Sequence, residues 1–199
     1  MARIIFISGG VRSGKSRLAE KLAIDRAYYH GKHLHYIATA QPSDKEMMLR
    51  IQHHQKQRQE SGKKWMTWEQ PRKVHQLATH FSSNDIILLD CLTTLLNNEF
   101  FYENRWSDYE FQQQIYANLV QGIKELSSKV DTLILVSNEI FHDVISDEPL
   151  VLVYGKMLGR LHQKIVKLAD EAYLVDAGCL IQMKGGEEYE RLNGRWNRL

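Results

Sequence analysis

The stretch Ile4-Ile5-Phe6-Ile7-Ser8, followed directly by Gly9-Gly10-Val11-Arg12-Ser13-Gly14-Lys15-Ser16, decides the fold. The first part is a short apolar run rich in β-formers, and the second matches the pattern of a glycine, four residues and then Gly-Lys-Ser. Glycines let backbone N–H groups turn toward phosphate oxygens, and the helix that follows points the positive end of its dipole at the same anion. An ordinary strand-to-helix turn could match by chance, but this pattern stands where the chemistry needs it. The sequence therefore predicts a phosphate-binding loop (P-loop) at Gly9, Gly10, Val11, Arg12, Ser13, Gly14, Lys15 and Ser16.

A P-loop that uses magnesium needs a second acidic group at the end of another buried strand. The run Ile86-Ile87-Leu88-Leu89, followed by Asp90, supplies one, although an Asp in that place is otherwise often the N-cap of a helix. We expect Lys15 to reach the β- and γ-phosphates, and Ser16 and Asp90 to hold Mg²⁺. These residues indicate a nucleotide-dependent enzyme, but they do not choose among kinases, ATPases and GTPases.

Apolar runs of strand length alternate with helical patterns along the whole chain. We expect strands at Ile4–Ser8, His35–Ala38, Lys64–Trp68, Ile86–Leu89, Thr132–Val136, Ala172–Val175 and Leu180–Met183. We expect helices at Ser16–Tyr29, Asp44–Gln59, Arg72–His80, Ser107–Ser127 and Leu150–Leu168. This alternation predicts an α/β, P-loop NTPase-like fold with a mostly parallel sheet, helices on both faces and an antiparallel edge near the C-terminus. No linker divides the sequence, so residues 1–199 are expected to form a single nucleotide-binding domain.

Composition narrows the class of protein. The chain has 199 residues, of which 43% are hydrophobic and 25% charged, which is typical of a globular protein. Its net charge of +2 argues against a nucleic-acid binder that relies on bulk positive charge. The apolar runs fall far short of the roughly 18 residues of a membrane span. We therefore expect a soluble cytoplasmic protein in which Cys91 and Cys179, both beside apolar runs, are buried free thiols.

The polar helix expected at Asp44–Gln59 carries a second candidate site. At about 100° per residue, one narrow sector of this helix holds Met47, Ile51, His54 and Arg58. His53 lies off that sector, while Arg50 and Arg58 flank His54 one turn away on either side. Such cations would stabilise the charge that builds up when a neutral imidazole attacks a phosphate, and they disfavour protonation of the ring. The alternative is a polar surface helix with two incidental histidines.

Together these motifs resemble those of the bifunctional adenosylcobinamide kinase/adenosylcobinamide-phosphate guanylyltransferase family of cobalamin biosynthesis. The resemblance runs through most of the chain. It rests on the P-loop, Tyr36-Ile37-Ala38-Thr39-Ala40, Arg50-Ile51-Gln52-His53-His54, Trp65-Met66-Thr67-Trp68-Glu69, Leu88-Leu89-Asp90-Cys91-Leu92-Thr93-Thr94 with Asn98, Val136-Ser137-Asn138-Glu139, Gly159-Arg160 with Gln163, and Ala169-Asp170-Glu171. Many families share a P-loop, so that motif alone does not identify the family. The Arg-Ile-x-His-His string followed by Trp-x-Thr-x-Glu is much more specific.

The resemblance implies a two-stage transferase. In the first stage ATP or another nucleoside triphosphate phosphorylates the aminopropanol hydroxyl of adenosylcobinamide. In the second stage GTP guanylylates a histidine, which matches His54, and the GMP then passes to the cobinamide phosphate. The nucleotide contacts of the family map to Gly9–Ser16, Ala38, Thr39, Ala40, Glu69 and Asp90. The resemblance also implies a homotrimer. Either Asp90 or Glu69 could be the base of the kinase step, and the sequence does not choose between them.

The sequence departs from the family pattern in its second half. Phe141 and Asp143 replace two glycines of a stretch that here reads Ile140 through Asp147, Tyr154-Gly155-Lys156 replaces Phe-Arg-Asp, and His162 replaces an Asn. Loop glycines set backbone geometry, so these changes leave two alternatives open. One is a related transferase with a different acceptor, and the other is a guanylyltransferase that has lost the kinase step.

Overall fold

A computed structural model of the chain describes residues 2–41, 45–140 and 147–185, without the side chains of Glu46, Met47, Arg50, His53 and Gln57. Its centre is a seven-stranded sheet in the order β3-β2-β4-β5-β1-β6-β7. The strands are β1 (Arg3–Gly9), β2 (His33–Ala38), β3 (Trp65–Glu69), β4 (Asp85–Asp90), β5 (Thr132–Asn138), β6 (Glu171–Asp176) and β7 (Cys179–Lys184). All neighbours pair in parallel except β6 and β7, which pair antiparallel. The predicted parallel sheet with an antiparallel edge is confirmed.

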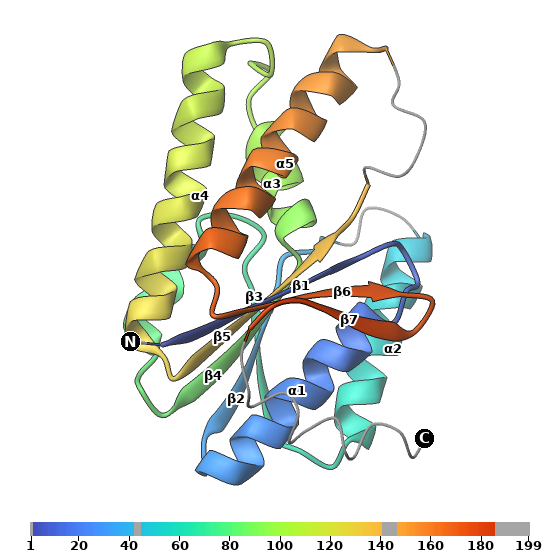
Figure 1. Ribbon diagram of the computed structural model, residues 1–199, viewed down its shortest axis with the longest axis vertical. Helices are drawn as coiled ribbons and strands as arrows, with labels where there is room; N and C mark the ends of the chain where they lie inside the picture. The colour runs from blue at the N-terminus through green and yellow to red at the C-terminus, as the bar shows by residue number, and fades with distance from the viewer. Residues whose placement is uncertain (1, 42–44, 141–146, 186–199) are drawn as a thin grey trace.

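Helices cover both faces of the sheet (Figure 1). The helices are α1 (Lys15–His30), α2 (Lys45–Glu60), α3 (Leu92–Phe100), α4 (Tyr109–Lys129) and α5 (Pro149–Leu168). α1 and α2 lie on one side of the sheet, and α3, α4 and α5 lie on the other, where α4 and α5 extend well beyond the sheet (Figure 1). We call these layers the α1–α2 face and the α3–α5 face.

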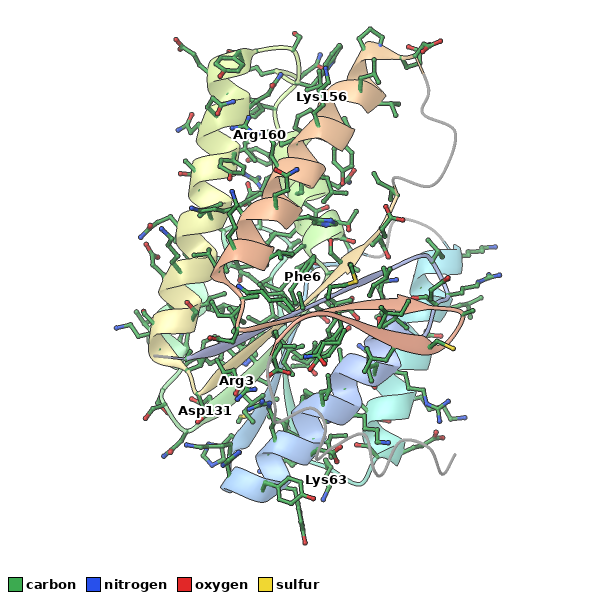
Figure 2. The ribbon with its side chains drawn as sticks, in the orientation of Figure 1. Arg3, Phe6, Lys63, Asp131, Lys156 and Arg160 are labelled. Atoms are coloured by element: carbon green, nitrogen blue, oxygen red, sulfur yellow. The ribbon has the colours of Figure 1, made fainter. Side chains whose placement is uncertain are left out.

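The two layers have separate hydrophobic cores because successive side chains of a strand point to opposite faces. In β1, Ile5 and Ile7 pack with the α1 residues on one face, whereas Ile4 and Phe6 pack with residues of α3, α4 and α5 on the other. Figure 2 shows Phe6 on the α5 side of the sheet. The strands β1, β4 and β5 are buried on both faces, which explains their nearly continuous apolar sequences.

The structure differs from the sequence prediction at three places. The segment expected to be an α-helix at Arg72–His80 is a 3₁₀-helix over Val74–His80. The short helix α3 was not predicted, although Leu92, Leu95, Leu96 and Phe100 form a buried helical stripe. Cys179 is exposed beside the β6–β7 turn, so the expectation of two buried thiols holds only for Cys91. Within the described residues, no helix is both long and apolar enough to cross a membrane.

Candidate functional site

The P-loop connects β1 to α1 in a compact turn. The Ser13 amide donates to the Gly10 carbonyl at 3.2 Å, and Lys15 Nζ donates to the same carbonyl oxygen at 2.9 Å. Lys15 is only 7% exposed although it carries an ammonium group. The helix begins at Lys15, directly after Gly14 in the left-handed conformation with φ +93°. The loop therefore gathers backbone N–H groups, a helix N-terminus and one lysine around a single point, which suits a phosphate chain.

The turn between β6 and β7 braces the P-loop from the side. The Gly178 amide donates to the Ser13 carbonyl at 3.1 Å. Gly9 is required by close approach, because a Cβ atom there would clash with the Val175 carbonyl oxygen and lie 2.7 Å from Ser13 Oγ. Arg12, exposed at the tip of the loop, has a φ of +61°, which is uncommon for a residue other than glycine. The conformation of the loop thus depends on strands that lie far away in the sequence.

The strand register gathers other predicted site residues at the same edge of the sheet. Ala38 stands opposite Glu69 of β3 on one side and opposite Asp90 of β4 on the other. Glu69 is exposed and Asp90 half-buried. The Tyr36 hydroxyl donates to Asp90 Oδ2 at 3.2 Å, and burial together with the Asp90 charge raises the pKa of Tyr36 well above its usual value. Tyr36 therefore keeps its proton and remains a donor to Asp90.

Thr39 and Ala40 follow β2, and Thr39 links strands of the sheet. Its hydroxyl donates to the Cys91 carbonyl at 2.9 Å and accepts from the Cys91 amide at 2.8 Å. Its own carbonyl accepts from Asn98 Nδ2 at 2.9 Å. The fully buried Thr39 side chain is thus occupied within the protein, while half-buried Ala40 is more accessible. A nucleotide contact through the Thr39 side chain has no support from this geometry.

The burial of α2 follows the predicted sector. Ile51 and His54 are half-buried and Arg58 is buried, whereas Gln52, Gln55, Lys56 and Gln59 are exposed. The side chains of Arg50 and His53 lie outside the described residues. The helix therefore turns the His54 side chain toward the interior of the α1–α2 face, as the helical periodicity predicts.

Arg58 joins α2 to the P-loop helix. Its Nη1 lies 3.4 Å from Oε1 of Glu20, and its guanidinium carbon lies 3.6 Å from the centre of the Tyr36 ring. Glu20 is 8% exposed, and burial raises its pKa to about 6, while the Arg58 charge opposes that rise. The guanidinium was expected to serve phosphate, but it faces a carboxylate and an aromatic ring in this structure.

A second polar cluster lies at the end of β5 on the α3–α5 face. Ser137 Oγ lies 2.7 Å from His162 Nε2 and 2.9 Å from Thr93 Oγ1, and the Asn138 amide donates to Thr93 Oγ1 at 2.8 Å. Burial lowers the pKa of His162 to about 4, so this ring is neutral at physiological pH. His162, which departs from the family pattern, is therefore accommodated as a neutral hydrogen-bonding group. Apart from Asp147, the altered segment 141–147 lies outside the described residues.

The sequence prediction missed two members of the site, Glu20 and Tyr36. Glu20 lies one turn after Ser16, on the same helical face as the buried Ala19 and Ala23. A carboxylate within an apolar stripe is a signal that could have identified it, because a buried charge needs a partner. The signal for Tyr36 was weaker, because buried tyrosines are common in strands.

Comparisons with known proteins match most of the chain to one family. Residues 5–183 match the family described as cobinamide kinase / cobinamide phosphate guanyltransferase. The chain is 31% identical over 188 residues to the bifunctional adenosylcobalamin biosynthesis protein CobU of Escherichia coli, an alignment that covers 91% of this chain and 99% of that protein. It is 35% identical over 180 residues to the bifunctional adenosylcobalamin biosynthesis protein CobP of Pseudomonas aeruginosa, covering 90% of this chain and 96% of that one.

Solved structures are similar at the level of the fold. One of them, an ATPase domain, superposes with a TM-score of 0.52 at 15% identity, covering 92% of this chain and 77% of that chain. Identity this low shows a shared P-loop NTPase-like architecture alone. The match over most of the sequence is what identifies the family: the chain belongs to the cobinamide kinase / cobinamide phosphate guanyltransferase family.

Proposed function

We propose that this chain phosphorylates adenosylcobinamide with ATP or another nucleoside triphosphate, and then transfers GMP from GTP to the product through a covalent intermediate on His54. Membership of the family supports the two activities. The observation that carries the role of His54 is the contact between Arg58 and Glu20, because it ties the inner side of α2 to the P-loop helix. The half-buried His54 lies on that same inner side, one turn before Arg58.

In the kinase step the acceptor hydroxyl attacks the γ-phosphorus of the triphosphate. A new O–P bond forms, the bond to the β–γ bridging oxygen breaks, and a nucleoside diphosphate leaves. The hydroxyl proton passes to a carboxylate, with Asp90 and Glu69 as the two candidates at the sheet edge. Phosphoryl transfer depends mostly on positioning and on charge stabilisation, which the P-loop amides and Lys15 supply.

In the guanylyltransferase step a ring nitrogen of His54 attacks the α-phosphorus of GTP. A P–N bond forms, the bond to the α–β bridging oxygen breaks, and pyrophosphate leaves. An oxygen of the cobinamide phosphate then attacks the same phosphorus and releases His54, which gives adenosylcobinamide-GDP. The histidine divides one displacement into two, each with a better-positioned nucleophile.

Ser16 and Asp90 are our proposed protein ligands for Mg²⁺. Within the part of the chain that the structure describes, no group of three or more His, Cys, Asp or Glu side chains could hold a metal ion. Mg²⁺ bound with a nucleotide usually takes one or two protein ligands and completes its shell with phosphate oxygens and waters. The hydroxyl and the carboxylate are hard oxygen donors that fit this chemistry, and the bound ion would neutralise charge on the phosphates.

The extent of the strand edge fits a whole nucleotide. Three strand spacings of about 4.8 Å separate β2 from β1 in the sheet, or about 14 Å. A nucleotide with its phosphates in the P-loop could therefore reach Ala38 and Ala40 with its ribose or base. Glu69 lies one strand further along the same edge, on β3, about 19 Å from β1. Homotrimer formation, which the family resemblance implies, remains a prediction for this chain.

Intact-protein mass spectrometry after incubation with GTP and Mg²⁺ tests the proposal. We expect the mass of one GMP to appear on the wild-type protein and on His53→Ala, and to be absent from His54→Ala. Addition of adenosylcobinamide phosphate should discharge the adduct. An adduct that persists in His54→Ala would refute the role of His54. The same assay with adenosylcobinamide and ATP, followed by product analysis, tests whether the kinase step survives the altered segment 141–147.

A further inference from the structure

The buried guanidinium of Arg58 is unusual for a helix as polar as α2. Arg58 is 5% exposed although it lies in the last turn of a helix whose outer positions are solvated. Burying a charged group is costly unless it is paired, so its surroundings must satisfy it. His54 lies four residues earlier, about 6 Å along the helix axis. Whatever holds Arg58 therefore also restrains His54.

Two different kinds of contact hold the guanidinium. Its edge faces Glu20 of α1 at 3.4 Å, and its flat surface covers the Tyr36 ring of β2 at 3.6 Å. Arginine can make both contacts at once because its charged group is planar, whereas lysine has no such flat surface. α2 is thus fixed against a helix and a strand at a single residue.

Both partners of Arg58 lead to the proposed catalytic groups. Glu20 lies one turn after Ser16 on the P-loop helix. Tyr36 donates to Asp90 at 3.2 Å. The Arg58 contacts therefore connect the helix that carries His54 directly to α1, which carries Ser16, and through the Tyr36 hydroxyl to Asp90 at the end of β4.

The energetics of the pair favour a geometric role over a stabilising one. Burial raises the pKa of Glu20 to about 6, and the attraction of Arg58 offsets this effect only in part. A buried ion pair with that property adds little to the free energy of folding compared with an apolar pair of similar size. Buried charged pairs can instead select one arrangement of the elements that they join.

We infer that Arg58 is a positioning residue of the guanylyltransferase reaction, which acts by clamping α2 to Glu20 and Tyr36 so that His54 faces the α-phosphate of the bound nucleotide. The inference rests on the proposed role of His54. It assigns to Arg58 no contact with phosphate. A group that only positions the nucleophile affects the rate of attack and leaves nucleotide affinity nearly unchanged.

A double-mutant cycle on guanylylation tests this role. The variants are Arg58→Met, Glu20→Gln and the double variant, with Lys56→Met as a control from the exposed side of α2, where the Lys56 side chain is 74% exposed. We expect each single variant to lower the single-turnover rate of GMP attachment about 10-fold, with the GTP concentration for half-maximal rate changed less than about 2-fold. The double variant should be no slower than the slower single variant, because both changes break the same contact.

Other outcomes would overturn the inference. Additive losses in the double variant, or a normal rate in Glu20→Gln, would show that Arg58 acts without Glu20. A rise in the half-maximal GTP concentration in Arg58→Met alone would indicate a direct phosphate contact. Arg58→Lys should fall between wild type and Arg58→Met, because it keeps the charge but loses the stacking on Tyr36.

Amide hydrogen exchange distinguishes failure of the inference from failure of the proposed function. If the wild-type protein carries GMP on a residue other than His54, the proposed function is wrong. The exchange data still test separately whether the Arg58 contacts hold α2 in place. Faster exchange in α2 of both Arg58→Met and Glu20→Gln, with α4 unchanged, would support the clamp. Unchanged exchange in α2 would refute it.

Discussion

The two faces of the sheet differ in the polar groups that they bury near the carboxyl ends of the strands. On the α1–α2 face, Lys15, Glu20 and Arg58 are buried as ionisable side chains. On the α3–α5 face, the corresponding place holds the hydroxyls of Thr93 and Ser137 and the neutral ring of His162. The α1–α2 face therefore buries charged side chains beside the P-loop. The buried polar groups of the α3–α5 face at this place are neutral and form hydrogen bonds with one another. The residues that depart from the family pattern and that the structure describes, among them His162, lie on the second face.

Loss of the P-loop ammonium should have the largest effect. We expect Lys15→Met to lower kcat/KM of both the kinase and the guanylyltransferase reactions by about 100- to 1000-fold, because it removes a charge that stabilises the transferring phosphates. Lys124→Met on the outside of α4, where the side chain is exposed, is the matched control and should leave both rates unchanged. Steady-state kinetics of the two half-reactions would measure this. Equal losses in the two variants would contradict the charge difference between the faces.

A methyl group at Gly9 should disturb the packing of the P-loop against β6. Gly9→Ala forces a Cβ atom against the Val175 carbonyl, and we expect a loss of about 2 kcal/mol in the free energy of unfolding. Gly10→Ala is the control, because no heavy atom lies within 4 Å of its added Cβ. Urea unfolding monitored by circular dichroism would compare the two variants. A Gly9→Ala protein as stable as Gly10→Ala would show that β6 does not constrain the loop.

Acid should destabilise the α3–α5 face through His162. Its pKa falls from the usual value of 6.5 to about 4 on folding, so the unfolded chain binds the proton first. Stability is then complete above pH 6.5 and is lost as the pH falls toward 4. At pH 5 we expect this effect to cost about 2 kcal/mol relative to pH 7.5. His162→Asn should remove that part of the pH dependence in urea unfolding at the two pH values. An identical pH dependence in both proteins would refute the buried neutral imidazole.

The smallest stability effect is expected at Ser13. Among the described residues, the buried Ser13 Oγ has no hydrogen-bond partner. Ser13→Ala therefore loses no internal hydrogen bond, and we expect the free energy of unfolding to change by less than about 0.5 kcal/mol. If the hydroxyl serves a bound phosphate, KM for GTP should rise several-fold in the same variant. A large loss of stability would instead show that the Ser13 hydroxyl helps to hold the conformation of the loop.

Much of the fold could be predicted because periodicity is a local property of the sequence. The strand at Ile86–Leu89 and the helix at Leu150–Leu168 agree closely with β4 and α5. Helix α3 was missed although its apolar spacing is helical, because Leu92–Phe100 is only nine residues long. The segment ending at His80 has helical spacing, but its tighter 3₁₀ form depends on packing against α4 rather than on local pattern.

Only those features of the candidate site that depend on residues close together in the sequence could be predicted. The P-loop and the orientation of His54 follow from motif and helical angle, and the structure agrees with both. The partners of Arg58 could not be inferred, because Glu20 is 38 residues away and no local rule pairs the two residues. The same holds for Thr39, whose hydroxyl is occupied by Cys91, 52 residues along the chain.

The position of β1 has a consequence for how the nucleotide site forms. β1 lies between β5 and β6, so the earliest strand in the sequence pairs with strands that come more than a hundred residues later. The amide of Ile4 bonds to the Asp170 carboxylate across 166 residues of chain. Closing such long loops is slow, and contacts of high sequence separation form late in folding. The P-loop therefore comes early in the sequence, but its conformation is completed late in folding. Nucleotide binding should appear only after β1 has paired with β5 and β6.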